Sequence, residues 1–145
     1  MYKGIDVSSY QGIIEWGTGK MQNIDFVIQR LGYGKNNIDK YAVRNLTECN
    51  KRDIAVGGYW FSYAYTVEMA RQEARQVLKL VKDFKLTYPI YYDFEYDSVR
   101  YAESKGVKIT RKLCNEMCIA FCEEIEQAGY YVGIYTNKDY MKNML

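Results

Sequence analysis

The sequence contains no histidine and only one proline in 145 residues. The absence of histidine excludes the Ser-His and Cys-His pairs of nucleophilic catalysis and most zinc sites. Any chemistry must therefore use carboxylates, tyrosine, lysine or cysteine, and we expect neither a metal nor another cofactor. No hydrophobic run reaches the roughly 20 residues that a membrane-spanning helix needs, so we expect no membrane partner.

The chain also lacks a strong net charge. A value of +2 is too small to indicate nucleic acid as a partner, and would at most favour a polyanionic surface such as a bacterial wall. Hydrophobic residues make up 48% of the chain, which predicts a single folded domain. The first residues run straight into a predicted strand with no apolar signal region. We therefore expect synthesis in the cytoplasm without a signal peptide.

Cysteine is scarce, and its spacing favours a structural role. Cys114, Cys118 and Cys122 recur every four residues on a predicted helix, and Cys49 stands alone. Cys114 and Cys122 would lie about 12 Å apart along the helix axis, too far to share one metal ion. We interpret all four as small, buried and reduced side chains.

Strands and helices alternate along the chain with short connections. The predicted strands are residues 3–8, 25–31, 54–63, 88–97 and 131–135, and the predicted helices are residues 13–22, 39–52, 67–84 and 110–127, with another beginning at residue 137. This alternation is typical of parallel βαβ units. The fold class is therefore α/β, as an open doubly wound sheet or as part of a (β/α) barrel.

The predicted strand 88–97 contains an Asp-Phe-Glu tripeptide. Asp93 and Glu95 would share one face with Cα atoms about 6.6 Å apart, together with Tyr91. Two carboxylates this close cannot both ionise freely, so one pKa should rise. A protonated and an ionised carboxyl group together can break a glycosidic bond. The alternative is a strand end with ordinary solvated acids, because the tripeptide alone is weak evidence.

Tyrosine is abundant, with 16 residues. Its flat ring and hydroxyl group suit sugar rings, although tyrosine is also a common half-buried residue. Active groups of parallel α/β folds gather at the carboxyl ends of the strands. Asp6, Tyr63, Asp93, Glu95 and Tyr135 all fall at or near such ends, which favours a sugar hydrolase.

Several segments resemble one family. Residues 4–12 (GIDVSSYQG), 57–63 (GGYWFSY), 93–95 (DFE) and 129–135 (GYYVGIY) resemble, in order and spacing, the glycoside hydrolase family 25 muramidases, the Chalaropsis-type lysozymes common in phage endolysins. The resemblance implies a flattened (β/α) barrel of the TIM type. It also implies a lysozyme that cleaves the β-1,4 bond between N-acetylmuramic acid and N-acetylglucosamine of peptidoglycan.

Carried over to this sequence, the resemblance makes Glu95 the general acid, with Asp93 and Asp6 as supporting carboxylates. The expected sugar-binding residues are Tyr33, Tyr59, Tyr63, Tyr91 and Tyr135. Glu95 should be protonated near neutral pH, because of its acidic neighbours and a wall of tyrosines. Two alternatives remain for the second step. Either the substrate's own N-acetyl group attacks the anomeric carbon, with Asp93 orienting the amide, or water attacks with Asp93 as the general base.

The resemblance covers roughly the first three quarters of the family's barrel domain. Family members usually continue with three more strands, another groove carboxylate and a Trp-Gln-Tyr segment. We therefore expect residues 1–145 to form one catalytic domain with an incomplete barrel and no cell-wall-binding module. Open strand edges predict self-association. The expected partner is the peptidoglycan glycan strand, at the cell wall after release, and the alternative is an inactive remnant that only binds this glycan.

Overall fold

The computed structural model describes residues 3–17, 19–21 and 23–137. Within these residues, five parallel strands form one sheet in the order β1 (Gly4–Val7), β2 (Phe26–Tyr33), β4 (Ala55–Phe61), β5 (Ile90–Asp93) and β6 (Val132–Tyr135). The five predicted strands are confirmed in position. A short strand that was not predicted, β3 (Asn37–Ile38), pairs antiparallel with β2.

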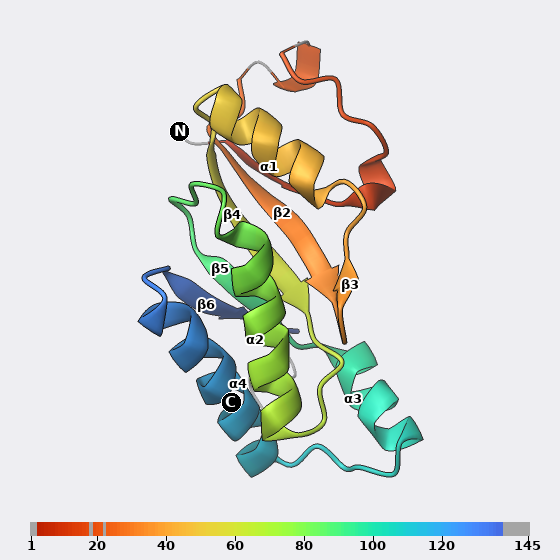
Figure 1. The fold of residues 1–145 in the computed structure, drawn as a ribbon. Coiled ribbons are helices and arrows are strands. Elements are labelled where there is room, and N and C mark those ends of the chain that lie inside the picture. Colours follow the sequence, from red (N-terminus) through yellow and green to blue (C-terminus); the bar gives the residue numbers. More distant parts are fainter. Residues whose placement is uncertain (1–2, 18, 22, 138–145) are drawn as a thin grey trace.

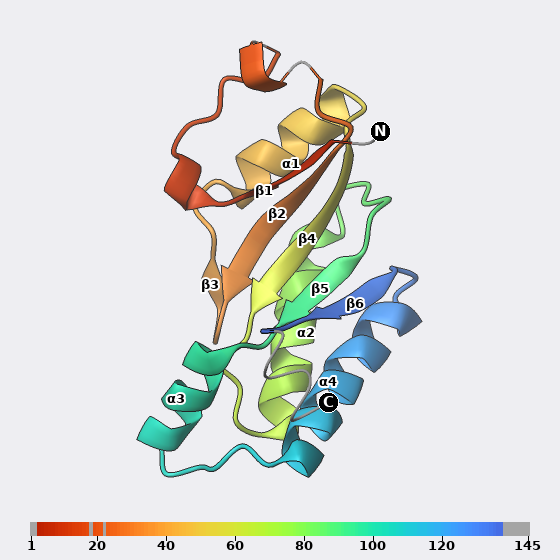
Figure 2. The same cartoon turned by 180° about the vertical axis from the view of Figure 1, so that it is seen from behind.

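Three helices cover one face of this sheet, as Figure 1 shows: α1 (Ala42–Lys51), α2 (Val67–Val81) and α4 (Arg111–Gln127). The view from behind shows the strands without a helix in front of them (Figure 2). A further helix, α3 (Tyr96–Ser104), lies beyond the carboxyl ends of the strands. The architecture is a flattened, incomplete barrel with its inner face open.

The alternation of side chains along the strands divides the sheet into two faces. The helix-covered face carries the core residues Val27, Leu31, Val56, Trp60, Ile90 and Tyr92, which are all fully buried. Tyr92 stacks on Phe121 of α4 with ring centroids 4.0 Å apart. The opposite face carries the residues between them in the sequence, and these include the predicted site residues.

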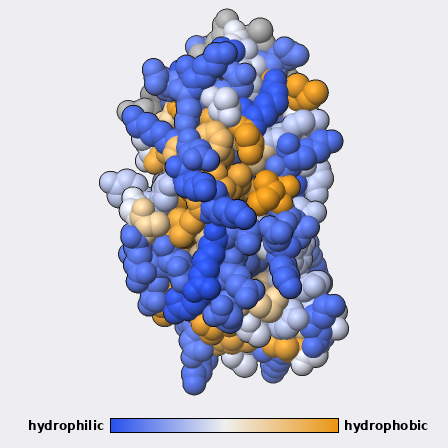
Figure 3. Space-filling model, viewed as in Figure 1, coloured by the Kyte–Doolittle hydropathy of each residue, from blue (hydrophilic) through white to orange (hydrophobic). Residues whose placement is uncertain are grey.

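Threonine side chains cap the starts of α2 and α4, whereas α1 begins three residues later than predicted and α2 ends three residues earlier. Thr66 and Thr110 each accept a hydrogen bond from the third residue of the following helix, at 3.0 and 3.1 Å. Gly129, with φ of +93°, follows α4 in the left-handed region that ends many helices. Figure 3 shows that the outer face of these helices is mostly hydrophilic, with scattered hydrophobic residues. Among the described residues, no helix is both long and apolar enough to span a membrane.

The predicted helix over residues 13–22 is wrong for the residues that the structure describes there. Only Gly19–Met21 form a short 3-10 helix, η2. Gly17 and Gly19 have φ values of +84° and +40°, which a right-handed helix does not contain. The segment is instead held by its side chains, because Trp16 is buried and donates a hydrogen bond of 3.2 Å to Asn45 of α1.

The predicted strand over residues 88–97 is too long. Strand β5 ends at Asp93, and the chain turns at Glu95 into α3, a helix that was not predicted. The backbone N–H of Glu95 donates to Ser98 Oγ at 3.1 Å, which stabilises this turn. Tyr96 therefore does not continue the buried face of the strand and is 40% exposed. The helix predicted from residue 137 falls on residues 138–145, outside the described part.

The cysteines on α4 pack as predicted. Cys114 and Cys118 are buried, as is Cys49 on α1, and Cys122 is half-buried. The four cysteines form no disulfide. Contact with Cys114 and burial raise the pKa of the Cys118 thiol far above its ordinary value, so this thiol stays protonated.

Candidate active site

Two adjoining hollows lie along the open face at the carboxyl ends of the strands. The first has a volume of about 430 Å³ and is lined by Asp6, Ile28, Tyr59, Tyr91, Asp93, Glu95 and Tyr135. The second has a volume of about 600 Å³ and is lined by Ser9, Tyr10, Arg30, Tyr33, Tyr59, Phe61, Tyr63, Asp93, Glu95 and Asp97. The hollows share Tyr59, Asp93 and Glu95, and we call them together the groove. The structure thus brings all the predicted site residues together.

Strand register places these side chains next to one another. Tyr59 of β4 pairs with Tyr91 of β5, and Asp93 at the end of β5 pairs with Tyr135 of β6. Asp6 enters from β1, where it pairs with Ile28 of β2. Because neighbouring residues in a parallel sheet point to the same side, the pleat alone directs these groups into the groove.

Asp93 is the most perturbed acid of the groove. Its side chain is only 6% exposed, and burial raises its pKa to about 9, together with a hydrogen bond to Glu95 and the charges of Glu95 and Asp6. Two carboxyl groups can share a hydrogen bond only when one of them carries a proton. Asp93 therefore holds its proton at neutral pH.

The sequence predicted a raised pKa on one carboxyl group of the tripeptide, and in the structure the pKa of Asp93 is raised. The pKa of Asp93 is raised because the strand ends at this residue and its side chain is buried. Asp93 is the last residue of β5 and is buried, whereas Glu95 has left the sheet and is half-buried. One oxygen of Asp93, Oδ1, is buried without a hydrogen-bond partner among the described residues.

Asn137 holds Glu95 in place, and the sequence analysis missed it. Its Nδ2 donates to Glu95 Oε1 at 3.3 Å, while its Oδ1 accepts from the backbone N–H of Tyr96 at 3.0 Å. Asn137 thus ties the loop after β6 to the start of α3. Its position two residues after the fifth strand was the available signal, because the carboxyl ends of parallel strands meet at one edge.

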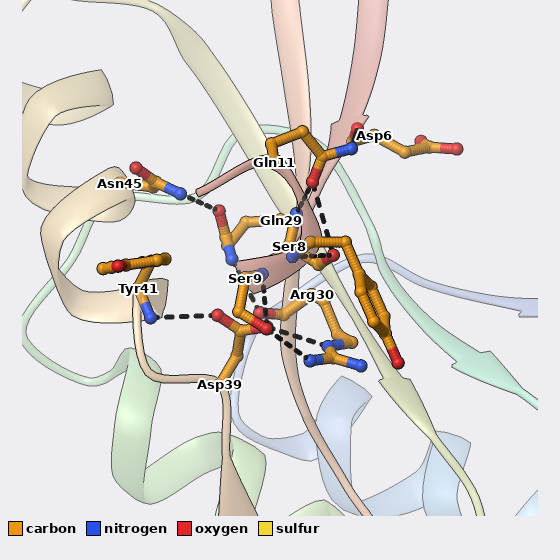
Figure 4. A network of polar contacts seen from close by, with 10 residues as sticks. Asp6, Ser8, Ser9, Gln11, Gln29, Arg30, Asp39, Tyr41 and Asn45 are labelled. Carbon is orange, nitrogen blue, oxygen red and sulfur yellow. Dashed lines mark hydrogen bonds and ion pairs between the residues drawn. The ribbon is translucent and has the colours of Figure 1, made fainter. Parts of the chain in front are cut away.

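Arg30 is a second residue that the sequence analysis missed. Its guanidinium forms an ion pair with Asp39, with Nε 2.8 Å from Oδ2, and donates to Ser9 Oγ at 3.0 Å (Figure 4). The same group lies 5.0 Å from the ring centre of Tyr10 and 5.3 Å from that of Tyr33. Arg30 thereby holds two tyrosines at one end of the groove.

Asp39 connects this arginine to two other segments. It is 3% exposed and accepts hydrogen bonds of 2.9 Å from the backbone N–H groups of Ser9 and Tyr41. These bonds fasten the loop after β1 and the start of α1 to β2 (Figure 4). The conformation of the loop after β1 therefore depends on one buried carboxylate.

A short 3-10 helix, η1 (Ser9–Gln11), shapes that loop. The backbone N–H of Ser8 donates to Gln11 Oε1 at 2.6 Å, and Ser8 Oγ accepts from the backbone N–H of Tyr10 at 3.2 Å (Figure 4). This reciprocal capping leaves Tyr10 86% exposed at the rim of the groove.

Tyrosine rings form a wall along the second hollow, and one of them, Tyr59, also lines the first. Burial raises the pKa of Tyr59 to about 12, so its hydroxyl stays protonated and can donate a hydrogen bond. The Tyr63 ring lies 5.1 Å from Phe61 and 6.3 Å from Tyr33, measured between ring centres. The wall offers ring faces and hydroxyl groups together, which is what a sugar chain can use.

A parallel α/β sheet that brings three carboxylates and a row of tyrosines to its carboxyl edge is a scaffold of the glycoside hydrolase class. The sequence profile of the family described as Glycosyl hydrolases family 25 matches residues 5–145. The chain therefore belongs to glycosyl hydrolase family 25.

Solved structures with the same fold agree with this assignment. The modular autolysin LytC from Streptococcus pneumoniae is 29% identical, with a TM-score of 0.86 over 99% of this chain and 34% of LytC. A family 25 glycosyl hydrolase from Bacillus anthracis is also 29% identical, with a TM-score of 0.80 over 99% of this chain and 64% of that protein. The catalytic domain of endolysin ply40, from bacteriophage P40 of Listeria monocytogenes, shares the fold at 20% identity and a TM-score of 0.79, over 98% of this chain and 66% of that domain.

The chain thus spans about a third of the length of LytC and less than two thirds of the Bacillus anthracis protein. The comparison with curated protein sequences found no significant match.

Proposed function

We propose that this chain is an N-acetylmuramidase, which cleaves the β-1,4 bond between N-acetylmuramic acid and N-acetylglucosamine in peptidoglycan. The observation that carries the proposal is the cluster of Asp6, Asp93 and Glu95 in a tyrosine-lined groove, where burial raises the pKa of Asp93. Family membership supports it. So does LytC, which was solved in complex with a synthetic peptidoglycan ligand.

In the proposed mechanism, Glu95 donates a proton to the glycosidic oxygen as the bond to the anomeric carbon breaks. Burial raises the pKa of Asp93 to about 9, so this group carries a proton at neutral pH. Transfer of this proton along the hydrogen bond would leave Glu95 protonated and Asp93 ionised. One proton shift would therefore prepare both an acid and a neighbouring carboxylate.

Two routes can complete the cleavage. In the first, the carbonyl oxygen of the substrate's own N-acetyl group attacks the anomeric carbon to form a cyclic oxazoline, and Asp93 accepts a hydrogen bond from the amide N–H. Water then attacks the anomeric carbon and breaks the bond to that carbonyl oxygen. In the second, Asp93 takes a proton from an attacking water molecule. The burial of Asp93 favours the first route, because an orienting role needs no room for water beside the carboxylate. The first route retains the anomeric configuration and the second inverts it.

The remaining expectations follow from this activity. The glycan strand would lie along Tyr33, Tyr59, Tyr63, Tyr91 and Tyr135, with its rings against the tyrosine faces. Residues 1–145 would act as one catalytic unit. The place of action would be the bacterial cell wall, reached after release from the cytoplasm.

The test is digestion of purified peptidoglycan, followed by borohydride reduction and mass spectrometry of the fragments. A muramidase yields fragments that end in reduced N-acetylmuramic acid, whereas a glucosaminidase yields reduced N-acetylglucosamine. Glu95→Gln should lose at least about 100-fold in rate, because Gln keeps the shape but cannot donate the proton. Glu103→Gln, on the exposed side of α3, is the matched control and should keep the activity.

Three outcomes would contradict the proposal. Ends in reduced N-acetylglucosamine would assign a different bond. More than about a tenth of the rate in a folded Glu95→Gln variant would remove Glu95 from the acid role. Co-sedimentation of the chain with cell walls, without new reducing ends, would identify the chain as a glycan-binding remnant.

A further inference from the structure

A fourth carboxyl group lies buried on the other side of the sheet from the groove. Glu73, on α2, is 3% exposed and does not line either hollow of the groove. Its Oε1 accepts from Ser62 Oγ at 2.8 Å and from the hydroxyl of Tyr92, and its Oε2 accepts from the backbone N–H of Tyr63 at 3.0 Å. One carboxyl group thus joins the end of β5 to the residues that follow β4.

These bonds lead directly to Asp93. Tyr92 immediately precedes Asp93 in β5, so the bond from its hydroxyl to Glu73 anchors the residue before this supporting carboxylate. Ser62, whose hydroxyl donates to Glu73, also donates its backbone N–H to the carbonyl oxygen of Asp93 at 2.8 Å. The backbone of Asp93 is therefore fastened on both sides by groups that Glu73 holds.

The third bond leads to the tyrosine wall. The backbone N–H of Tyr63 is held by Glu73, while the Tyr63 ring stands in the groove 5.1 Å from Phe61 and 5.1 Å from Tyr101. A substitution of Glu73 would therefore alter the groove at two points, the position of Asp93 and the position of the Tyr63 ring.

The position of Glu73 is costly for the fold. Burial raises the pKa of Glu73 to about 7, although three donors stabilise its charged form. A well-packed apolar side chain avoids the desolvation of a buried carboxyl group and often stabilises a protein. The geometry gives a reason for a carboxyl group here, since two separate strand ends are held at once.

We propose that Glu73 is a positioning residue for glycan cleavage: by holding Ser62, Tyr63 and Tyr92, it sets the position of Asp93 and of the tyrosine wall in the groove. Its effect on catalysis rests on the proposed muramidase activity, but its effect on Asp93 does not. The competing account is that Glu73 contributes only to folding stability.

Two substitutions separate geometry from charge. In Glu73→Gln the amide oxygen can accept from the Tyr63 N–H, and the amide nitrogen can donate to the hydroxyls of Ser62 and Tyr92, which are able to accept. This variant keeps all three connections without a charge. In Glu73→Leu all three connections are lost. Leu46→Ala, in the core beneath α1 and away from the groove, serves as a control for lost stability.

The first measurement is kcat and KM on soluble glycan fragments, with the folded fraction checked by circular dichroism. We expect Glu73→Leu to lose at least about 10-fold in kcat with little change in KM, because small displacements of catalytic groups are costly. Glu73→Gln should stay within about 3-fold of the parent, since the connections are rescued. Leu46→Ala should lower the melting temperature but leave kcat per folded molecule unchanged.

The second measurement does not depend on turnover. Carbon-13 NMR of the Asp93 carboxyl group reports its titration directly, and we expect the raised pKa to persist in Glu73→Gln and to fall in Glu73→Leu. An unchanged Asp93 titration in Glu73→Leu, or a kcat loss no greater than that of Leu46→Ala, would overturn the proposal. If the parent chain does not cleave glycan, the muramidase proposal fails while the NMR titration still decides the role of Glu73.

Discussion

Asp93 and Glu95 are two residues apart in the sequence but belong to different elements, and their carboxyl groups share a hydrogen bond. One residue ends the strand and the other starts the helix, so the chain turns between them. Because Asp93 is the buried member, the proton is retained at the sheet and can be passed to the more exposed member.

This arrangement predicts how stability depends on pH. Asp93 has a folded-state pKa of about 9, above its ordinary value, so the folded chain binds more protons than the unfolded chain between those values. The contribution of Asp93 is fully present at low pH and is lost as pH rises toward 9. Asp93→Asn should remove this pH-dependent loss of stability. Its free energy of unfolding, relative to that of the parent, should rise by at least about 1 kcal/mol between pH 5 and pH 8.

Urea unfolding of both proteins at several pH values is the measurement. Glu73 also has a raised pKa, so the parent's own curve contains both groups, and only the difference between parent and variant isolates Asp93. If the difference in free energy of unfolding between parent and variant is constant from pH 5 to pH 8, Asp93 is ionised in the folded protein at neutral pH.

Asn137 should matter for cleavage through its bond to Glu95. Asn137→Ala removes the donor to Glu95 Oε1 and the acceptor for the N–H of Tyr96. A typical hydrogen bond contributes about 1 kcal/mol, so we expect a loss of roughly 5- to 10-fold in kcat/KM. The assay is release of reducing ends from peptidoglycan.

The neighbouring residue supplies the control. Thr136 Oγ1 is buried and has no hydrogen-bond partner among the described residues. Thr136→Val keeps the shape of the side chain and removes a hydroxyl that forms no hydrogen bond with the described residues. Activity and stability should therefore be unchanged or slightly higher. Equal losses in Asn137→Ala and Thr136→Val would indicate that this segment is sensitive to any change, and would remove the specific role of Asn137.

The ion pair between Arg30 and Asp39 should be important for stability. The Asp39 side chain is fully buried and that of Arg30 is 14% exposed. Asp39→Ala leaves the guanidinium and two backbone N–H groups without their acceptor, and breaking such a buried pair costs about 3 kcal/mol or more. Chemical denaturation measures this loss.

An exposed ion pair gives the comparison. Glu48 pairs with Arg52 at 3.2 Å on the outside of α1, with side chains 25% and 39% exposed. Glu48→Ala should cost less than about 0.5 kcal/mol, as exposed helix pairs do. If Asp39→Ala and Glu48→Ala lose the same free energy of unfolding, the Arg30–Asp39 pair does not organise the loop after β1.

The sequence predicts the sheet well because its signals are local. Alternation along the strands identified the two faces of the sheet. The start of α3 was missed because Asp93, Phe94 and Glu95 continue the strand's alternation, whereas a hydrogen bond to Ser98 turns the chain. Arg30 and Asn137 were missed because their roles depend on partners far along the chain, Asp39 and Glu95.

The last prediction concerns the edge of the sheet at β6. Within the described residues, β6 pairs only with β5, so one of its sides is unpaired. Unpaired edges of this kind invite pairing with another chain. Tyr131, which immediately precedes β6, is 74% exposed and adds an apolar surface at this edge. We therefore expect the 145-residue chain to self-associate, with an apparent mass that rises with concentration in static light scattering.

Two substitutions to lysine locate the contact. Tyr131→Lys places a charge beside the edge and should shift the chain toward monomer, because edge lysines oppose strand pairing. Ile119→Lys changes a residue of α4 that is 57% exposed on the helix side, and should leave association unchanged. A parent chain that is monomeric at every concentration and melts cooperatively would contradict the prediction, since the edge would then be protected within one molecule.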